Sequence, residues 1–263
     1  MLGRLLAERG KRVLLLEAEP RESLHQALGT EPSAGAVVQA GPRLWLQNLR
    51  AQAVIEDLVR DKVPFAYLAH KITNSPGFHH FVEGAPGLKE TALLGHAYQV
   101  LRGSRRPKAD VVILDAPATG HGTTLLAAPG LLAQAAQGGQ LGDMASNLAA
   151  YLADPAHCGV VLAALAEEMP VQETLELLEV LHTRLHLRPD LVVANGLYPK
   201  LSEGGARNPA MALLRARRQL NEAELARLAA AWDGPLLELP LLALERGPSL
   251  VQALAALLRE ADS

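Results

Sequence analysis

Short runs of consecutive apolar residues recur along the chain, and stretches with apolar residues at helical spacing separate them. The runs occupy residues 13–16, 44–46, 111–114, 160–162, 191–193 and 236–237. Continuous apolar runs of this length are typical of strands buried on both faces of a parallel sheet. Stretches such as Leu94, Tyr98 and Leu101 predict amphipathic helices. The alternation predicts an α/β fold, with a mostly parallel sheet and helices on both of its faces.

Residues 1–10 predict a helix that has an end but no marked beginning. Leu2, Leu5 and Leu6 lie at helical spacing, and Gly10 is the residue type that most easily adopts the left-handed conformation of a helix end. No Ser, Thr, Asp or Asn precedes them as an N-terminal cap. We therefore expect the chain to start inside a helix.

Two stretches, residues 51–85 and 122–153, do not fit the simple alternation. We expect them to form helical insertions within a single domain that spans residues 1–263. Asn221, followed three residues later by Glu224, resembles a capping box and predicts a helix start. His182 and His186 lie four residues apart on a predicted helix, a spacing that can chelate a metal. No third ligand is evident nearby in the sequence, so we expect no zinc site.

Charge and composition narrow the class of protein. The net charge of −3 argues against a dedicated nucleic-acid binder, because such proteins usually carry a basic face that neutralises phosphates. The single cysteine, Cys158, excludes an intrachain disulfide and fits a reducing compartment. No apolar stretch approaches the ~20 residues that a membrane-spanning helix needs. The N-terminus lacks the apolar region of a signal peptide, so we expect a cytoplasmic protein.

The strongest local signal for chemistry is a predicted buried strand that ends in Asp115 and opens into a loop with Pro, Thr and Gly. In open α/β sheets, ligands bind at the carboxyl ends of the strands. In a phosphoryl-transfer enzyme, a carboxylate there would hold Mg²⁺ directly or through water, while the loop moves with the γ-phosphate. The alternative is an ordinary strand followed by a turn that Asp115 caps.

The segment from Asp115 to His121 resembles the signature Asp-Thr-Ala-Pro-Thr-Gly-His of the ArsA family of ATPases. That family includes arsenite-pump ATPases and the guided-entry ATPases that deliver tail-anchored membrane proteins. Further segments resemble the family in the same order over nearly the whole chain. They are residues 9–20, Pro86-Gly87-Leu88-Lys89-Glu90, Glu173-Thr174, residues 192–195 and Leu239-Pro240-Leu241.

The resemblance implies a P-loop NTPase-like fold that uses ATP and Mg²⁺, and it implies roles for the matching residues. Asp115 would be the carboxylate on the magnesium side. Thr119, Gly120 and His121 would belong to the second switch. Glu19 takes the place of the first-switch aspartate that orients or deprotonates the attacking water, but it is one methylene longer. The alternative for Glu19 is a solvated loop carboxylate.

The resemblance also implies a base site and partners. Asn195 would hydrogen-bond the nucleotide base, and Pro240 and Leu241 would line its pocket. A homodimer that encloses the nucleotides is expected, with a protein client or a membrane-protein partner; residues 122–153 would suit a client cover, although packing within the domain is the simpler interpretation. The cysteine pair that holds an intersubunit zinc in some guided-entry ATPases is absent, as are the clustered thiols that bind arsenite.

One part of the family pattern is missing from these 263 residues. Family members begin with a strand and a Lys-Gly-Gly-Val-Gly-Lys-Thr loop, whereas no Gly-Lys-Ser or Gly-Lys-Thr occurs here. That loop supplies the backbone N–H groups and the Lys that hold the phosphates. We therefore expect weak nucleotide binding at most and no appreciable ATP hydrolysis by the chain as written. The absent first strand would leave its neighbours in the middle of the sheet unpaired.

Three interpretations follow from this gap. The first is an ArsA-family ATPase whose true start lies upstream of Met1. The second is a non-catalytic interaction protein that keeps the same scaffold. The third is a positioning ATPase similar to ParA and MinD, against which the Thr-Gly-His sequence and the lack of an obvious terminal amphipathic membrane helix both argue.

Overall fold

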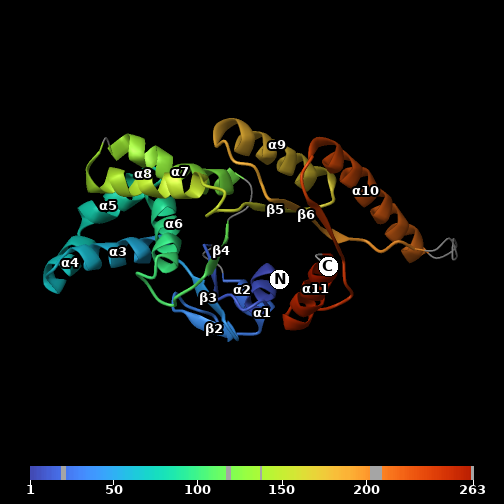
Figure 1. The fold of residues 1–263 in the computed structure, drawn as a ribbon, viewed down its shortest axis with the longest axis horizontal. Coiled ribbons are helices and arrows are strands. Elements are labelled where there is room, and N and C mark those ends of the chain that lie inside the picture. The colour runs from blue at the N-terminus through green and yellow to red at the C-terminus, as the bar shows by residue number, and fades with distance from the viewer. Residues whose placement is uncertain (19–21, 117–119, 137, 202–208, 262–263) are drawn as a thin grey trace. The chain divides into compact units, whose positions relative to one another are not determined.

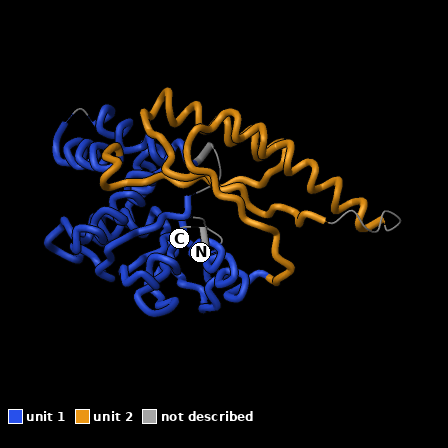
Figure 2. Tube along the Cα trace, turned by 45° about the vertical axis from the view of Figure 1, so that its right-hand side comes forward, with its two compact units in different colours: residues 1–152, 246–263 blue, residues 153–245 orange. Residues whose placement is uncertain are grey.

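A computed structural model describes residues 1–18, 22–116, 120–136, 138–201 and 209–261. The chain divides into two compact units (Figure 2). Unit 1 combines Met1–Leu152 with Arg246–Ser263, and unit 2 consists of Ala153–Glu245. Unit 2 is thus an insertion between two parts of unit 1.

Unit 1 contains a four-stranded sheet in the order β2-β3-β1-β4. β1 (Val13–Glu17) pairs in parallel with β3 (Leu44–Asn48) and with β4 (Val111–Asp115). β2 (Val38–Gly41) pairs antiparallel with β3. The three parallel strands lie where the apolar runs predict them. β2 was not predicted, because its residues form no continuous apolar run.

Helices cover both faces of this sheet. Successive side chains of a strand point to opposite faces, so β1 packs against helices on both sides. Val13 of β1 packs with Ala7 of α1 (Leu2–Glu8) on one face. Leu14 and Leu16 pack on the other, in a core that includes Val54 of α3 (Ala51–Lys62) and residues of α6 (Leu88–Leu101). The predicted α/β class, with a mostly parallel sheet and helices on both faces, is confirmed.

The helices of unit 1 other than α1 and α6 form three groups. α3, α4 (Ala66–Thr73) and α5 (Pro76–Gly84) fall within residues 51–85. α7 (Gly120–Ala136) packs on α6, and α8 (Gly139–Ala153) follows it (Figure 1). α11 (Pro248–Ala261) packs against α1 and α2 (Leu24–Leu28). Both stretches that depart from the alternation in the sequence are therefore helical.

Unit 2 contains a three-stranded parallel sheet in the order β5-β6-β7, made by β5 (Val161–Leu165), β6 (Leu191–Leu197) and β7 (Leu236–Pro240). α9 (Glu168–Arg184) contacts β5, and α10 (Pro209–Ala231) contacts β6 and α9. The pattern of the sequence predicts all three strands, because each contains a continuous apolar run.

Each sheet has an open edge at a strand that the sequence predicts to be buried. β4 ends one sheet and β5 ends the other, and no strand among the described residues pairs with their outer sides. On β5, Val161 and Leu165 are each 45% exposed. Unpaired N–H and C=O groups along such an edge can accept a further strand.

Two predictions about helices are wrong. Asn221 does not begin a helix: it lies buried inside α10. His182 and His186 do not share a helix, because α9 ends at Arg184 and His186 adopts a positive φ of 53°. None of the described helices combines the length and apolar character that crossing a membrane requires.

Candidate functional site

Three polar residues end three neighbouring strands of the unit 1 sheet. Glu17 of β1 pairs in register with Asn48 of β3 on one side and with Asp115 of β4 on the other. Register partners on adjacent parallel strands direct their side chains to the same face of the sheet. Glu17 and Asn48 are each 1% exposed, whereas Asp115 is exposed. The carboxyl edge of this sheet therefore presents two carboxylates side by side.

The Glu17 carboxylate holds the chain that follows β1. Its Oε1 accepts hydrogen bonds from Ser23 N at 2.7 Å, Ser23 Oγ at 2.7 Å and Leu24 N at 3.1 Å. These N–H groups belong to the first residues of α2, where a negative charge is favourable. Oε2 of Glu17 is buried and accepts no hydrogen bond from a described residue. One oxygen thus fixes the backbone while the other remains available.

A second carboxylate continues this anchoring. Glu22 accepts hydrogen bonds from Ser33 N at 2.6 Å and Ala34 N at 2.9 Å. The Ser33 hydroxyl in turn accepts a hydrogen bond from Asn48 N at 2.7 Å. Residues 22–24 and 33–35 are thereby tied to the carboxyl end of β3. Residues 22–24 and 33–35 therefore lie close to Glu17 and Asn48.

The signature residues occupy the connection between β4 and α7. Asp115 is the last residue of β4, and Gly120 and His121 are the first residues of α7. Thr119 lies outside the described residues, and so does Glu19. The structure therefore places Asp115 at the carboxyl edge of the sheet and the backbone of Gly120 and His121 at the start of α7, and it does not describe the predicted catalytic residue.

Close packing fixes the first turns of α6 against α7. Gly87, which precedes α6, has a φ of +74°. A Cβ atom there would lie 3.1 Å from the carbonyl oxygen of Ala128 in α7. Only glycine combines this backbone conformation with so close an approach at low cost. The Pro-Gly segment at residues 86–87 thus places the helix that begins with Gly120 and His121.

A buried histidine of α6, His96, lies next to Gln47 of β3. His96 Nε2 lies 3.2 Å from Gln47 Oε1, and Gln47 Nε2 donates to Gly35 O at 2.9 Å. Burial, together with the positive charge of Arg105, lowers the pKa of His96 from 6.5 to about 4, and the negative charge of Asp57 opposes this shift. His96 is therefore neutral at pH 7, and the network it joins links α6 to β3 and to the turn at residues 33–35.

The three residues predicted to form the base site all lie in unit 2. Asn195 is exposed near the carboxyl end of β6, where the register with β7 shifts between Ala194 and Leu197. Gly196, with a φ of +73°, allows this irregularity. Pro240 ends β7, and Leu241 N donates to Leu197 O at 2.7 Å. Asn195, Pro240 and Leu241 therefore lie at the carboxyl ends of adjacent strands.

Asn221 joins this end of the sheet to α10. Its Oδ1 accepts a hydrogen bond from Tyr198 N at 2.8 Å, and its Nδ2 donates to Ala166 O at 2.7 Å. Both groups of the amide are satisfied, as burial requires. Asn221 thus fixes the chain just after β5 and just after β6. The apparent capping box is instead a buried connection between strands and helix.

Two buried polar residues of this site, Glu17 and Asn48, were not predicted from the sequence. Glu17 closes an apolar run, and Asn48 closes the next strand of the sheet. A charged or amide side chain that directly ends a predicted buried strand is the signal that could have found both. Among the described residues, no group of three His, Cys, Asp or Glu side chains is arranged to hold a metal ion by itself.

Comparison with known proteins matches a family model to the first part of the chain. Residues 1–146 match a family model described as anion-transporting ATPase. ATPase BagA of Mycobacterium tuberculosis and putative ATPase Mb3704 of Mycobacterium bovis are each 27% identical to the chain over 202 residues. The alignments cover 74% of this chain and 59% of each relative, so the chain spans less than two thirds of the length of these proteins. The family match includes Asp115 and ends before Asn195.

Proposed function

Because the chain belongs to the family of anion-transporting ATPases, we propose that it is a nucleotide-dependent switch protein that uses ATP and Mg²⁺. One observation supports this most strongly: Glu17 and Asp115 end adjacent parallel strands in the same register and on the same face. A pair of carboxylates at the carboxyl edge of an α/β sheet is suited to the magnesium side of a nucleotide site.

The side chains present fit a magnesium ion. Mg²⁺ prefers oxygen ligands and is usually held by one or two carboxylates together with phosphates and water. Asp115 would hold the ion, directly or through water. Glu17 Oε2, buried without a hydrogen-bond partner among the described residues, would lie beside it. Bound there, the ion would neutralise negative charge on the phosphates.

The base would bind in unit 2. Asn195 offers an amide that can both donate and accept hydrogen bonds, which a purine edge requires. Pro240 and Leu241 add apolar surface next to it, and Leu241 is 49% exposed. Burial of that surface under a planar ring would contribute to affinity.

The switch and catalytic roles rest on the resemblance. Glu19 would orient the attacking water, and Thr119, Gly120 and His121 would respond to the γ-phosphate. The anchoring of Ser23 and Leu24 by Glu17 supports this, because it fixes one end of the segment that carries Glu19. Since the 263 residues contain no Gly-Lys-Ser or Gly-Lys-Thr, we propose weak nucleotide binding and no appreciable hydrolysis by the chain by itself.

The partners and location are likewise proposals. A homodimer in the cytoplasm, acting on a protein client or a membrane-protein partner, is the arrangement that the resemblance implies. Residues 122–153 are the possible client cover. Within them, Leu131 is 50% exposed and Met144 is 41% exposed, whereas Leu125, Leu132 and Leu148 are buried. Most of the apolar surface of α7 and α8 therefore packs within unit 1, which favours a small client contact over a large one.

Binding to the base alone tests the site in unit 2. Calorimetric titration of the 263-residue chain with adenosine should detect weak binding, and Asn195→Ala should weaken it about tenfold, as expected for the loss of hydrogen bonds in a partly buried site. Asn147→Ala, an exposed residue of α8, serves as the control. Equal affinities of the wild-type chain and Asn195→Ala would contradict the base site.

A chain extended in front of Met1 by a strand and a Gly-Lys-Thr loop tests the magnesium side. It should bind ATP more tightly when Mg²⁺ is present, and Asp115→Asn should abolish the dependence on Mg²⁺. Binding without hydrolysis would favour the alternative of a non-catalytic interaction protein. Failure to bind Mg-ATP would overturn the nucleotide proposal as a whole.

A further inference from the structure

The side chains of His96 and Gln47 form a bridge that holds the turn at residues 33–35. His96 Nε2 lies 3.2 Å from Gln47 Oε1, and Gln47 Nε2 donates a hydrogen bond to Gly35 O at 2.9 Å. His96 belongs to α6, Gln47 to β3 and Gly35 to the connection between α2 and β2. The bridge therefore runs from a buried side chain of a helix, across a strand, to a loop.

The direction of these bonds fixes the protonation of His96. A carbonyl oxygen such as Gly35 O only accepts, so the amide nitrogen of Gln47 faces it and the amide oxygen faces His96. His96 Nε2 must then carry the proton, and Nδ1 keeps a lone pair. Nδ1 is buried and has no hydrogen-bond partner among the described residues. A second proton at Nδ1 would find no acceptor among them, so the bridge requires the neutral ring.

The turn that the bridge holds is itself a clamp for a carboxylate. Ser33 N and Ala34 N donate to the two carboxylate oxygens of Glu22 at 2.6 and 2.9 Å. Successive backbone N–H groups of a turn form a concave site for an anion. Ala34 has a left-handed φ of 49°, which is unfavourable for a residue with a Cβ atom and persists only where neighbouring contacts hold it. The bond to Gly35 O is such a contact, on the next residue.

Residues 22–24 connect this clamp to the carboxyl edge of the unit 1 sheet. Glu17 Oε1 accepts hydrogen bonds from Ser23 N at 2.7 Å and Leu24 N at 3.1 Å. The residue before them, Glu22, is the one that the turn holds. The segment is therefore fixed from two sides. Release of Glu22 would allow Ser23 and Leu24 to move away from Glu17, and the Glu17 carboxylate would lose what orients it.

We propose that His96 is a positioning residue of the nucleotide site: through Gln47 and the turn at residues 33–35, it keeps residues 22–24 against Glu17. The Glu17 carboxylate is thereby kept oriented for the magnesium side. Hydrogen bonds suit this role because each is directional and satisfies a group that would otherwise be left without a partner. The effect on magnesium rests on the proposed function, whereas the effect on residues 22–24 does not.

Amide hydrogen exchange of the 263-residue chain, measured by NMR, tests the positioning directly. In His96→Leu, which removes the donor of the bridge, exchange should be about tenfold faster, as expected for the loss of one hydrogen bond. The reporters are the amides of Ser23, Ser33 and Ala34. The amide of Val13, hydrogen-bonded at 2.8 Å at the opposite end of β1, should exchange as before. Unchanged reporters, or an equal acceleration at Val13, would overturn the proposal.

Rescue separates positioning from a merely structural role. His96→Gln places an amide nitrogen at about the reach of Nε2, so it can donate to Gln47 and should restore slow exchange of the reporters. Gln47→Leu removes the middle of the bridge and should reproduce the effect of His96→Leu, whichever of the two variants folds better. Fast exchange in His96→Gln, equal to that in His96→Leu, would mean that the hydrogen bond does not position the turn.

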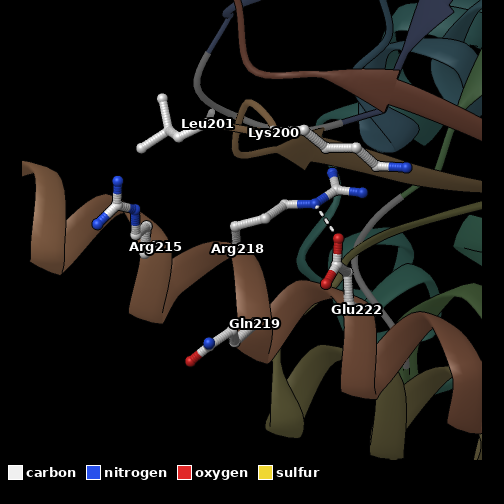
Figure 3. A pocket seen from close by; sticks show the side chains of 6 residues that line it. All are labelled: Lys200, Leu201, Arg215, Arg218, Gln219 and Glu222. Carbon is white, nitrogen blue, oxygen red and sulfur yellow. Dashed lines mark hydrogen bonds and ion pairs between the residues drawn. The ribbon is translucent and has the colours of Figure 1, made fainter. Parts of the chain in front are cut away.

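Two other glutamines provide matched controls. Gln39 lies in the same sheet, and its side chain bonds within its own strand, β2. Gln219 is exposed on α10 of unit 2, and Figure 3 shows its side chain pointing away from the ion pair drawn on the same helix. Gln39→Leu and Gln219→Leu should leave exchange of the reporters unchanged. Acceleration in either control equal to that in Gln47→Leu would overturn the proposal.

The chain extended in front of Met1 by a strand and a Gly-Lys-Thr loop tests the consequence for the site. In that chain, His96→Leu should weaken binding of Mg-ATP about threefold and leave binding of ATP without Mg²⁺ unchanged. Equal Mg-ATP affinities of the wild type and His96→Leu would overturn the role at the magnesium side. If the extended wild type binds no Mg-ATP, the proposed function fails instead, and the exchange measurement still decides whether His96 positions residues 22–24.

Discussion

At the scale of single residues, buried polar side chains position the functional parts of this protein. Glu17 and Asn221 are both buried, and each is bonded to backbone groups outside its own strand or helix. A buried polar atom that loses its partner costs about 1–3 kcal/mol. Such residues therefore fix backbone geometry more strictly than an apolar contact, which can slide.

Replacement of Asn221 by Ala should destabilise the protein substantially. The change leaves Tyr198 N and Ala166 O without their side-chain partner, and we expect a loss of about 2 kcal/mol or more in the free energy of unfolding. Urea denaturation followed by circular dichroism would measure it. Arg217→Ala, exposed on the same helix, should change stability by less than about 0.5 kcal/mol. Similar losses in both variants would mean that the Asn221 bonds contribute nothing specific.

At the scale of elements, a single residue, Gly87, allows α6 to pack closely against α7, the helix that begins with the last signature residues. Gly87 combines a left-handed backbone with contact to Ala128. Gly95, in the middle of α6, has open space around its Cα and a normal helical position. A larger side chain would therefore be strained at Gly87 but would fit at Gly95.

Alanine substitutions at these glycines should change stability in opposite directions. Gly87→Ala should lower the free energy of unfolding by about 1–2 kcal/mol, because the left-handed conformation is strained for alanine and Ala128 is close. Gly95→Ala should raise it by about 0.5–1 kcal/mol, because alanine is favoured in helix interiors. Thermal unfolding of both variants provides the measurement. Stabilisation by Gly87→Ala would show that the contact between α6 and α7 is looser than described.

The elements also show what the sequence could and could not predict. Continuous apolar runs predict six of the described strands, because burial on both faces demands such runs. β2 was not predicted, because a strand at the edge of a sheet need not contain a continuous apolar run. Asn195 and Pro240 lie at the same end of the unit 2 sheet because their strands pair in parallel, and their role in binding a base stays a prediction. The true role of Asn221 depends on contacts with Ala166 and Tyr198, residues distant in sequence, which local patterns do not encode.

At the scale of the whole molecule, a buried neutral histidine couples stability to pH. The pKa of His96 is about 4 in the folded protein, whereas an unfolded histidine titrates near 6.5. Protonation below pH 6.5 therefore favours the unfolded chain, so the contribution of His96 to stability is complete above pH 6.5 and is lost as the pH falls toward 4. The full shift corresponds to about 3 kcal/mol.

Unfolding of the wild-type chain and of His96→Gln, measured between pH 7.5 and 4.5, should reveal this coupling. The wild-type chain should lose stability relative to the variant over this range, because glutamine does not titrate. Asp110, whose pKa the neighbouring Arg12 holds well below its ordinary value, is common to both chains and titrates at lower pH. Parallel pH profiles for the two chains would mean that His96 is not the titrating group.

The discontinuity of unit 1 has a consequence for the order in which the protein is made. The α11 helix, which packs on α1 and α2, is translated only after all of Ala153–Glu245. At a synthesis rate of about 5–20 residues per second, the ribosome takes about 5–20 s to pass through that insertion. During this time unit 2 is being synthesised, and the surface that α1 and α2 offer to α11 stays uncovered. Nascent unit 1 is therefore a substrate for chaperones that recognise apolar surface, for as long as its last helix is still to come.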